Sequence, residues 1–191
     1  MSLYLKVSSN WKKYEKELIA ITGGLIRIQY DEMLKNEYPK LSGNLLLYSE
    51  SQKHNSYFNR KLYIGRSGEI KNASESEDDF GNIKNINSVM ELKTIIEKPD
   101  FQKHWFVHKE SCDICKDCEL RHMCVDNRVP YHRTDGMWYF INECNYNPYI
   151  SKWKGEEGYQ KLNEIGVVSD EKSFHRDDKK ITKINKVLWS Y

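Results

Sequence analysis

The stretch SCDICKDCELRHMC, residues 111–124, contains four of the five cysteines in this chain of 191 residues. The fifth is Cys144, and no cysteine precedes Cys112. Asp, Lys, Glu and Arg side chains separate the thiols, so the stretch is too polar to bury its cysteines as an ordinary apolar core. Clustered thiols in a protein without an export signal bind a metal more often than they form disulfides. We therefore expect a loop region that is organised around a metal.

The composition and charge indicate a soluble protein of the cytoplasm. Hydrophobic residues make up 39% of the chain and charged residues 30%, and no apolar run reaches the length that crosses a bilayer. We see no signal peptide at the start of the sequence. The formal net charge is only +2, without the clustered basic excess of a nucleic-acid-binding protein. We expect neither a membrane nor a nucleic acid as a partner.

Local sequence signals predict an α+β fold, with a small antiparallel β-hairpin or sheet, a cysteine-rich metal-bound loop region and flanking helices. Strands are predicted at 25–30 and 44–49, a hairpin at 60–73, and helices at 11–22, 88–97, 156–165 and 179–189. Ser88 and Glu91 form a capping box that starts the second of these helices. Ile181, Ile184 and Leu188 share one face of the last helix, which predicts that this helix packs on the core.

The thiols can be grouped in three ways. Cys112, Cys115 and Cys118 match the Cys-x2-Cys-x2-Cys run of bacterial ferredoxins, but His122 and Met123 stand where that run continues with Cys and Pro. A zinc ribbon needs two independent Cys-x2-Cys knuckles, and the chain has one. The third grouping has the pattern Cys-x2-Cys-x5-Cys followed by one distant cysteine. Its members are Cys115, Cys118, Cys124 and Cys144.

Four thiolates around one centre suit either zinc or an iron–sulfur cluster. His122 lies inside the five-residue spacing and could replace a thiolate on zinc, but we favour a loop position or a hydrogen bond to a ligand. In the third grouping Cys112 is a spare thiol. The spacing alone leaves the choice between the ferredoxin-like set and the third set open.

The third grouping resembles the cysteine-rich core of SPASM domains, the C-terminal modules that carry auxiliary [4Fe–4S] clusters in radical-SAM peptide-modifying enzymes. Further segments, in family order over roughly residues 44–189, resemble the SPASM-domain peptide maturase of the grasp-with-spasm systems. These segments are YFNRKLYIGRSGEIKN, FGNI, CVDNRVP, ECNYNPYISKWKGEEGY and ITKINKVLW. The resemblance implies one [4Fe–4S] cluster, with zinc as the alternative, on Cys115, Cys118, Cys124 and Cys144.

Two departures from the SPASM pattern are informative. Two-cluster SPASM domains have cysteines where this chain has Ala73 and Asn127, and both serve the first auxiliary cluster. The resemblance thus implies that one cluster was lost as a unit and the other was kept. The chain also lacks the radical-SAM motif Cys-x3-Cys-x2-Cys, so it cannot itself cleave S-adenosylmethionine. We interpret residues 1–50 as the remnant of a radical-SAM-like barrel and residues 51–191 as the SPASM-like domain with C-terminal helices.

The resemblance implies a function in the maturation of ribosomally synthesised peptides. We expect a module that binds a precursor peptide or an ATP-grasp ligase and that is not catalytic by itself. One alternative is the electron-relay part of a radical-SAM-type peptide-modifying enzyme. Another is a zinc-stabilised binding domain without a redox role.

Overall fold

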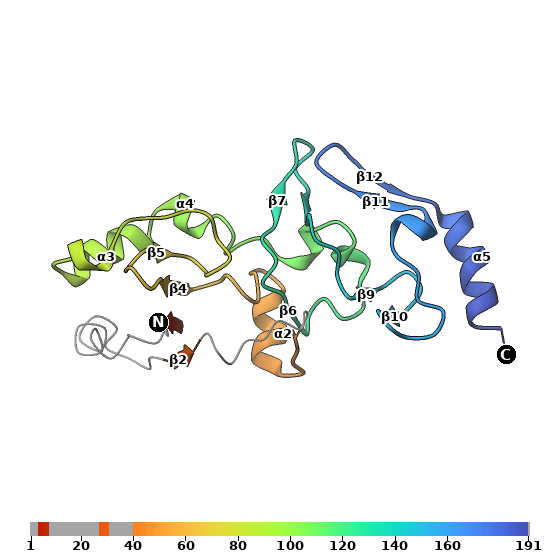
Figure 1. Ribbon diagram of the computed structural model, residues 1–191, viewed down its shortest axis with the longest axis horizontal. Helices are drawn as coiled ribbons and strands as arrows, with labels where there is room; N and C mark the ends of the chain where they lie inside the picture. The colour runs from red at the N-terminus through yellow and green to blue at the C-terminus, as the bar shows by residue number, and fades with distance from the viewer. Residues whose placement is uncertain (1–3, 8–26, 31–39, 191) are drawn as a thin grey trace. The chain divides into compact units, whose positions relative to one another are not determined.

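The computed structural model describes residues 4–7, 27–30 and 40–190 (Figure 1). The chain divides into two compact units. The first unit contains the described residues up to position 37 and Tyr57–Phe106, and the second contains positions 38–56 and the chain from Val107 onward. The predicted boundary near residue 50 does not coincide with this division, because positions 38–56 belong with the cysteines. The helix predicted at 11–22 lies outside the described residues.

A four-stranded sheet in the order β2-β1-β4-β5 forms the centre of the first unit. Its strands are β1 (Tyr4–Val7), β2 (Arg27–Tyr30), β4 (Lys61–Ile64) and β5 (Ile70–Lys71). The antiparallel β4–β5 pair confirms the predicted hairpin, and β2 confirms the strand predicted at 25–30 over its described residues. β1 pairs in parallel with both β2 and β4. We did not predict these parallel pairs, because strands that are joined by long connections share no turn signal.

Two helices follow the hairpin in the first unit, α3 (Val89–Ile96) and α4 (Pro99–Gln102). The predicted capping box is confirmed: Ser88 Oγ accepts a hydrogen bond from the Glu91 backbone N–H at 3.2 Å. The Glu91 carboxylate accepts one from the Asn87 backbone N–H at 2.8 Å. The hairpin and both helices contribute to one apolar core. It consists of Leu62, Ile64, Ile70, Ile83, Leu92, Ile95, Ile96, Phe101 and Trp105.

The second unit contains a helix where a strand was predicted. Residues 44–49 were expected to be extended, but Leu45–Ser51 form α2, so that prediction is wrong. The side chain of Asn44 accepts a hydrogen bond from the Leu47 backbone N–H at 2.7 Å and caps the helix. Leu45 and Leu46 are both exposed, so the segment lacks the alternation of buried and exposed residues that a half-buried strand requires. Leucine also has a high helix propensity.

The described part of the second unit also contains four antiparallel pairs of short strands. They are β3 (Lys40–Leu41) with β6 (Cys124–Val125), β7 (Tyr131–His132) with β8 (Trp138–Tyr139), β9 (Tyr146–Asn147) with β10 (Lys152–Trp153), and β11 (Val167–Ser169) with β12 (Phe174–Arg176). Short strand pairs beside helices confirm the predicted α+β class.

The C-terminal helix is confirmed and the helix predicted before it is not. α5 (Asp178–Leu188) begins after Asp177, whose carboxylate accepts a hydrogen bond from the Lys180 N–H at 3.0 Å. Its buried Ile181 belongs to the core of the second unit. At 156–165 only a 3-10 turn at Asn163–Ile165 forms, because Gly158 has a φ of +78° that a helix cannot continue. No helix in the described ranges is long and apolar enough to span a membrane.

Candidate metal centre

The cysteine loop, residues 112–124, contains little regular structure. A single 3-10 turn spans Cys115–Asp117, and β6 begins at Cys124. Between Asp113 and Cys115 the chain makes a γ-turn: the Cys115 N–H donates to the Asp113 carbonyl at 2.6 Å, and Ile114 has φ +64° and ψ −51°. This type of γ-turn is rare and strained, above all at a β-branched residue. The turn redirects the chain immediately before the first of the predicted ligands.

The four predicted ligands line one pocket in the second unit. The lining contains the four cysteines together with Lys109, Ile114, Leu120, Arg121, Arg128, Tyr146 and Pro148. Neither Cys112 nor His122 occurs among these described lining residues. Within the described ranges, however, no three His, Cys, Asp or Glu side chains stand close enough together to hold a metal ion. The thiols therefore share a pocket, but they do not form a closed ligand set.

Cys124 is buried, and the other three thiols of this pocket are partly exposed. Burial raises the pKa of Cys118 and of Cys124 to about 12, and it also raises the pKa of Cys144. A metal that binds here must therefore displace protons from the thiols. The Tyr146 backbone N–H already donates to Cys144 Sγ at 3.4 Å, a contact that favours the thiolate.

Cys112 occupies a separate position. Its side chain is completely buried, and its Sγ lies 3.5 Å from the carbonyl oxygen of His108. Burial raises the pKa of this thiol to about 12. Its place outside the lining agrees with the third grouping, although membership of the ligand set stays a prediction without a bound metal.

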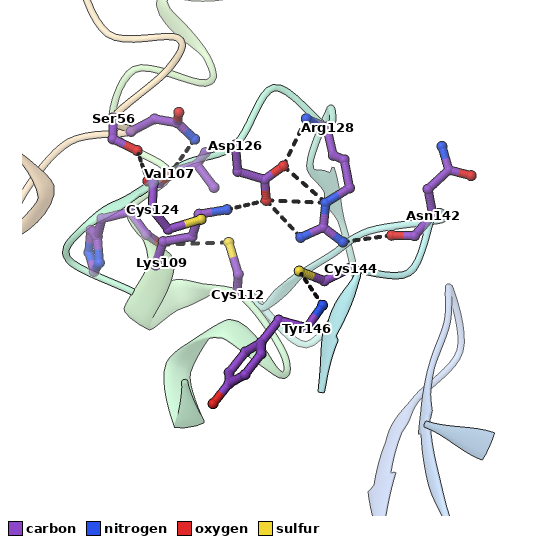
Figure 2. Close-up of polar contacts among 12 residues, drawn as sticks. Ser56, Val107, Lys109, Cys112, Cys124, Asp126, Arg128, Asn142, Cys144 and Tyr146 are labelled. Atoms are coloured by element: carbon purple, nitrogen blue, oxygen red, sulfur yellow. Dashed lines mark hydrogen bonds and ion pairs between the residues drawn. The ribbon is translucent and has the colours of Figure 1, made fainter. Parts of the chain in front are cut away.

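A buried charge cluster adjoins the thiol pocket, and we define it as Lys109, Asp126 and Arg128 (Figure 2). Asp126 is 1% exposed and lies 2.5 Å from Lys109 Nζ and 2.7 Å from Arg128 Nη2. Burial alone would lower the pKa of Lys109, but the charge of Asp126 raises it above its ordinary value. Burial alone would raise the pKa of Asp126, and the two cations instead hold it well below its usual range. All three groups are therefore charged at neutral pH.

The two cations of the charge cluster have further contacts that hold them in place. Arg128 Nη1 donates to the carbonyl oxygen of Asn142 at 2.7 Å. Lys109 Nζ lies 4.6 Å and Arg128 Cζ 4.3 Å from the centroid of the Phe140 ring, within the range of cation–π attraction. The loop that carries Cys144 thus also positions the cations.

His122, the possible zinc ligand, is engaged elsewhere. Its Nδ1 lies 3.2 Å from Ser51 Oγ and 3.1 Å from Gln52 Nε2, and its Nε2 lies 3.7 Å from a Glu110 carboxylate oxygen. The ring therefore attaches the end of α2 to the cysteine loop. The hydrogen bond from Ser56 Oγ to the Cys124 carbonyl, at 2.6 Å, makes a second attachment to the same segment of chain.

A second buried ion pair connects the cysteine loop to two strand pairs. Arg133 and Asp113 are 2% and 1% exposed, and Arg133 Nη1 lies 2.7 Å from Asp113 Oδ2. The Ser169 hydroxyl donates to the same oxygen at 3.1 Å. Arg133 follows β7, and Ser169 ends β11. The pair therefore fixes the residue next to Cys112 against both elements.

A cavity of about 160 Å³ lies beside the thiol pocket. The two share Ile114, Cys115, Arg128 and Cys144. Its other walls come from the segment 140–143, from 162–163 and from β11. The apolar part of the lining consists of Ile114, Phe140, Ile141, Leu162, Val167 and Val168. A small apolar group that entered this cavity would stand next to two of the predicted ligands.

Sequence reasoning missed the charge cluster and the Arg133–Asp113 pair. A charged residue in a polar loop normally faces water, so hydropathy indicates exposure at these positions. The available signal was the density of acidic and basic residues around the cysteines, which gives neither the partners nor their burial.

Comparison of the chain with protein-family models, with curated proteins and with solved structures found no match. The interpretation of the site therefore depends on its own residues.

Proposed function

We propose that this chain is a SPASM-type module in which four thiolates hold a [4Fe–4S] cluster, with zinc as the alternative. The observation that carries the proposal is that one pocket is lined by the four predicted ligands and not by Cys112. These ligands are Cys115, Cys118, Cys124 and Cys144. A cluster with four cysteine ligands supplies one-electron transfer and cross-links the chain, whereas zinc supplies only the cross-link.

The surroundings of the pocket fit an anionic metal complex. Two buried cations, Lys109 and Arg128, line it together with the thiols. Arg121 and a set of apolar and aromatic side chains, Ile114, Leu120, Tyr146 and Pro148, form the remaining wall. Because every ligand position is taken by a thiolate, no metal coordination site remains for a substrate. The module is accordingly not catalytic by itself.

The partners that we propose are a precursor peptide and an ATP-grasp ligase in the cytoplasm. Two features of the second unit support a peptide ligand. The cavity of about 160 Å³ is lined by apolar side chains together with polar and charged ones, and it can take a peptide side chain beside the thiol pocket. β11 and β12 form a sheet of two strands in the described chain, so an extended peptide could add to an outer edge. The module would then hold the precursor for a modifying partner.

Metal content after anaerobic purification tests this proposal. We expect iron and acid-labile sulfide in equal amounts, with the broad visible absorption of a cluster. Cys144→Ser should lose the metal, and the matched variant Cys112→Ser should keep it. Zinc in place of iron would favour the zinc-stabilised binding domain. Loss of the metal in Cys112→Ser together with its retention in Cys124→Ser would establish the ferredoxin-like grouping and contradict ours.

A further inference from the structure

The charge cluster has an unequal number of positive and negative groups. Lys109 and Arg128 provide two positive charges and Asp126 one negative charge, which leaves a net charge of +1. A buried ion pair that only stabilised the fold would need one cation for one carboxylate, because an excess buried charge is costly. The excess charge therefore requires a compensating anion nearby.

We propose that the charge cluster sets the affinity and the redox potential of the metal centre, with Lys109 and Asp126 acting in opposite directions. The proposal rests on the proposed function, because it concerns the same four thiolates. It assigns Lys109, Asp126 and Arg128 as positioning residues that act on the metal through the electrostatic potential. None of the three has to touch the metal.

The thiolates of the pocket would supply the negative charge that compensates the charge cluster. Lys109 and Arg128 both line the thiol pocket. Once metal binding has converted the thiols to thiolates, Lys109 would attract Cys115 and Cys124, and Arg128 would attract Cys115 and Cys144, because these side chains line the same pocket. The two cations thus reach three of the four predicted ligands, from two directions.

The size of the charges makes the effect large. Zinc with four thiolates carries a net charge of about −2, and an oxidised four-iron cluster has the same balance. Lys109 is 5% exposed and Asp126 1%, so water screens their charges weakly. The third cation of the pocket, Arg121, lies 3.7 Å from Glu110, which balances its charge. The excess of +1 in the charge cluster is therefore the main compensation for the complex.

Four forms of the protein test the proposal, because the summed charge of residues 109, 126 and 128 differs among them in a defined way. The wild type has +1, Lys109→Met has zero, Asp126→Asn has +2, and the double variant Lys109→Met/Asp126→Asn returns to +1. Zinc affinity is measured for each by competition with a chromophoric chelator. We expect roughly tenfold weaker binding for Lys109→Met, tighter binding for Asp126→Asn and near-wild-type binding for the double variant.

A cluster-bound preparation gives a second measurement, the midpoint potential. Positive charge near a cluster stabilises its reduced form, so Lys109→Met should lower the potential and Asp126→Asn should raise it. A purely structural ion pair predicts a different pattern, since each single variant breaks the pair and both would weaken the metal site. Weaker zinc binding in both single variants would overturn the inference. Unchanged binding and unchanged potential in both single variants would also overturn it.

Two controls keep the outcomes separate. If the wild type binds no metal, both the proposed function and this inference are wrong. If the wild type binds metal and the variants do not diverge, only this inference fails. If a single variant does not fold, the double variant is compared with a triple variant that adds Arg128→Met. In the triple variant none of the three positions 109, 126 and 128 carries a charge. The triple variant should then bind zinc roughly tenfold more weakly than the double variant.

Discussion

Ile114, in the lining of the thiol pocket, has an unusual backbone conformation. Its φ of +64° and ψ of −51° belong to a strained γ-turn, and such conformations cost about 1–3 kcal/mol. The side chain compensates part of that cost, because it packs against the second core and lines the thiol pocket. Strain next to Cys115 is consistent with a turn whose shape serves the ligands more than the stability of the fold.

The strain at Ile114 predicts that a glycine variant is more stable than an alanine variant, which is the reverse of the usual order. Ile114→Gly and Ile114→Ala both lose the packed side chain, but only glycine adopts this conformation without strain. We expect Ile114→Gly to have the higher free energy of unfolding, by about 1 kcal/mol, in urea denaturation. At ordinary positions alanine is the more stable of the two. An alanine variant equal to or more stable than the glycine variant would contradict the strained turn.

At the scale of the element, α2 depends on the residue that caps its N-terminus. The helix has only seven residues, Leu45–Ser51, and its Asn44 cap supplies a hydrogen bond to an otherwise unpaired N–H. Asn44→Ala should therefore lower the free energy of unfolding of the second unit by about 1 kcal/mol. The matched control is Leu46→Ala in the same helix, where the side chain is 84% exposed and the change should stay within about 0.5 kcal/mol. Equal losses in chemical denaturation would argue against the cap.

The element β7 is connected to the cysteine loop by one arginine with two acidic partners. Arg133 contacts Asp113, which is 1% exposed, and Asp135, which is 52% exposed. Asp113→Asn leaves Arg133 with only the exposed carboxylate of Asp135, so this variant should cost about 1–3 kcal/mol. Asp135→Asn should cost much less than Asp113→Asn, because water screens the exposed pair. Urea denaturation of the two variants compares them directly, and similar costs would show that the Asp113 pair contributes little.

At the scale of the whole molecule, the two units have separate cores. The first core includes Leu62 and Phe101, and the second includes Ile150 and Ile165. All four predicted ligands belong to the second unit. Loss of the metal should therefore destabilise the second unit and leave the first folded.

Hydrogen exchange before and after chelation measures this difference. We expect faster exchange of the amides in β9 and β10, which follow Cys144 closely, once the metal is removed. Amides in β4 and β5 of the first unit should keep their protection, and they serve as the internal control. Simultaneous loss of protection in both units would show that the metal stabilises the chain as one cooperative body.

The proposed partners give a prediction for the intact protein. A module that holds a precursor should bind the leader peptide or the ATP-grasp ligase without S-adenosylmethionine. Isothermal titration should therefore show heat in its absence, and the same titration with a scrambled leader peptide is the control. Heat that arises only after S-adenosylmethionine is added would favour the electron-relay alternative instead.

Local signals in the sequence were sufficient wherever neighbouring residues decide the structure. Ser88 and Asp177 begin helices because each side chain accepts a hydrogen bond from a backbone N–H three residues ahead. The hairpin at 60–73 formed as predicted, with Gly68 at a φ of +100° in its turn. Spacing alone left two groupings of the thiols open, and the resemblance favoured the one whose four cysteines line a single pocket.

Tertiary structure decided the features that depend on contacts between distant segments. Asn44 caps a helix where strand-forming residues between turn signals had suggested a strand, and that helix meets the cysteine loop at His122. The charge cluster joins Lys109 to Asp126 across 17 positions of sequence. Whether a charged side chain faces water or a buried partner depends on the free energy of the completed fold. Local sequence determines where a helix or turn can begin, but only the folded chain determines which charges are taken out of water together.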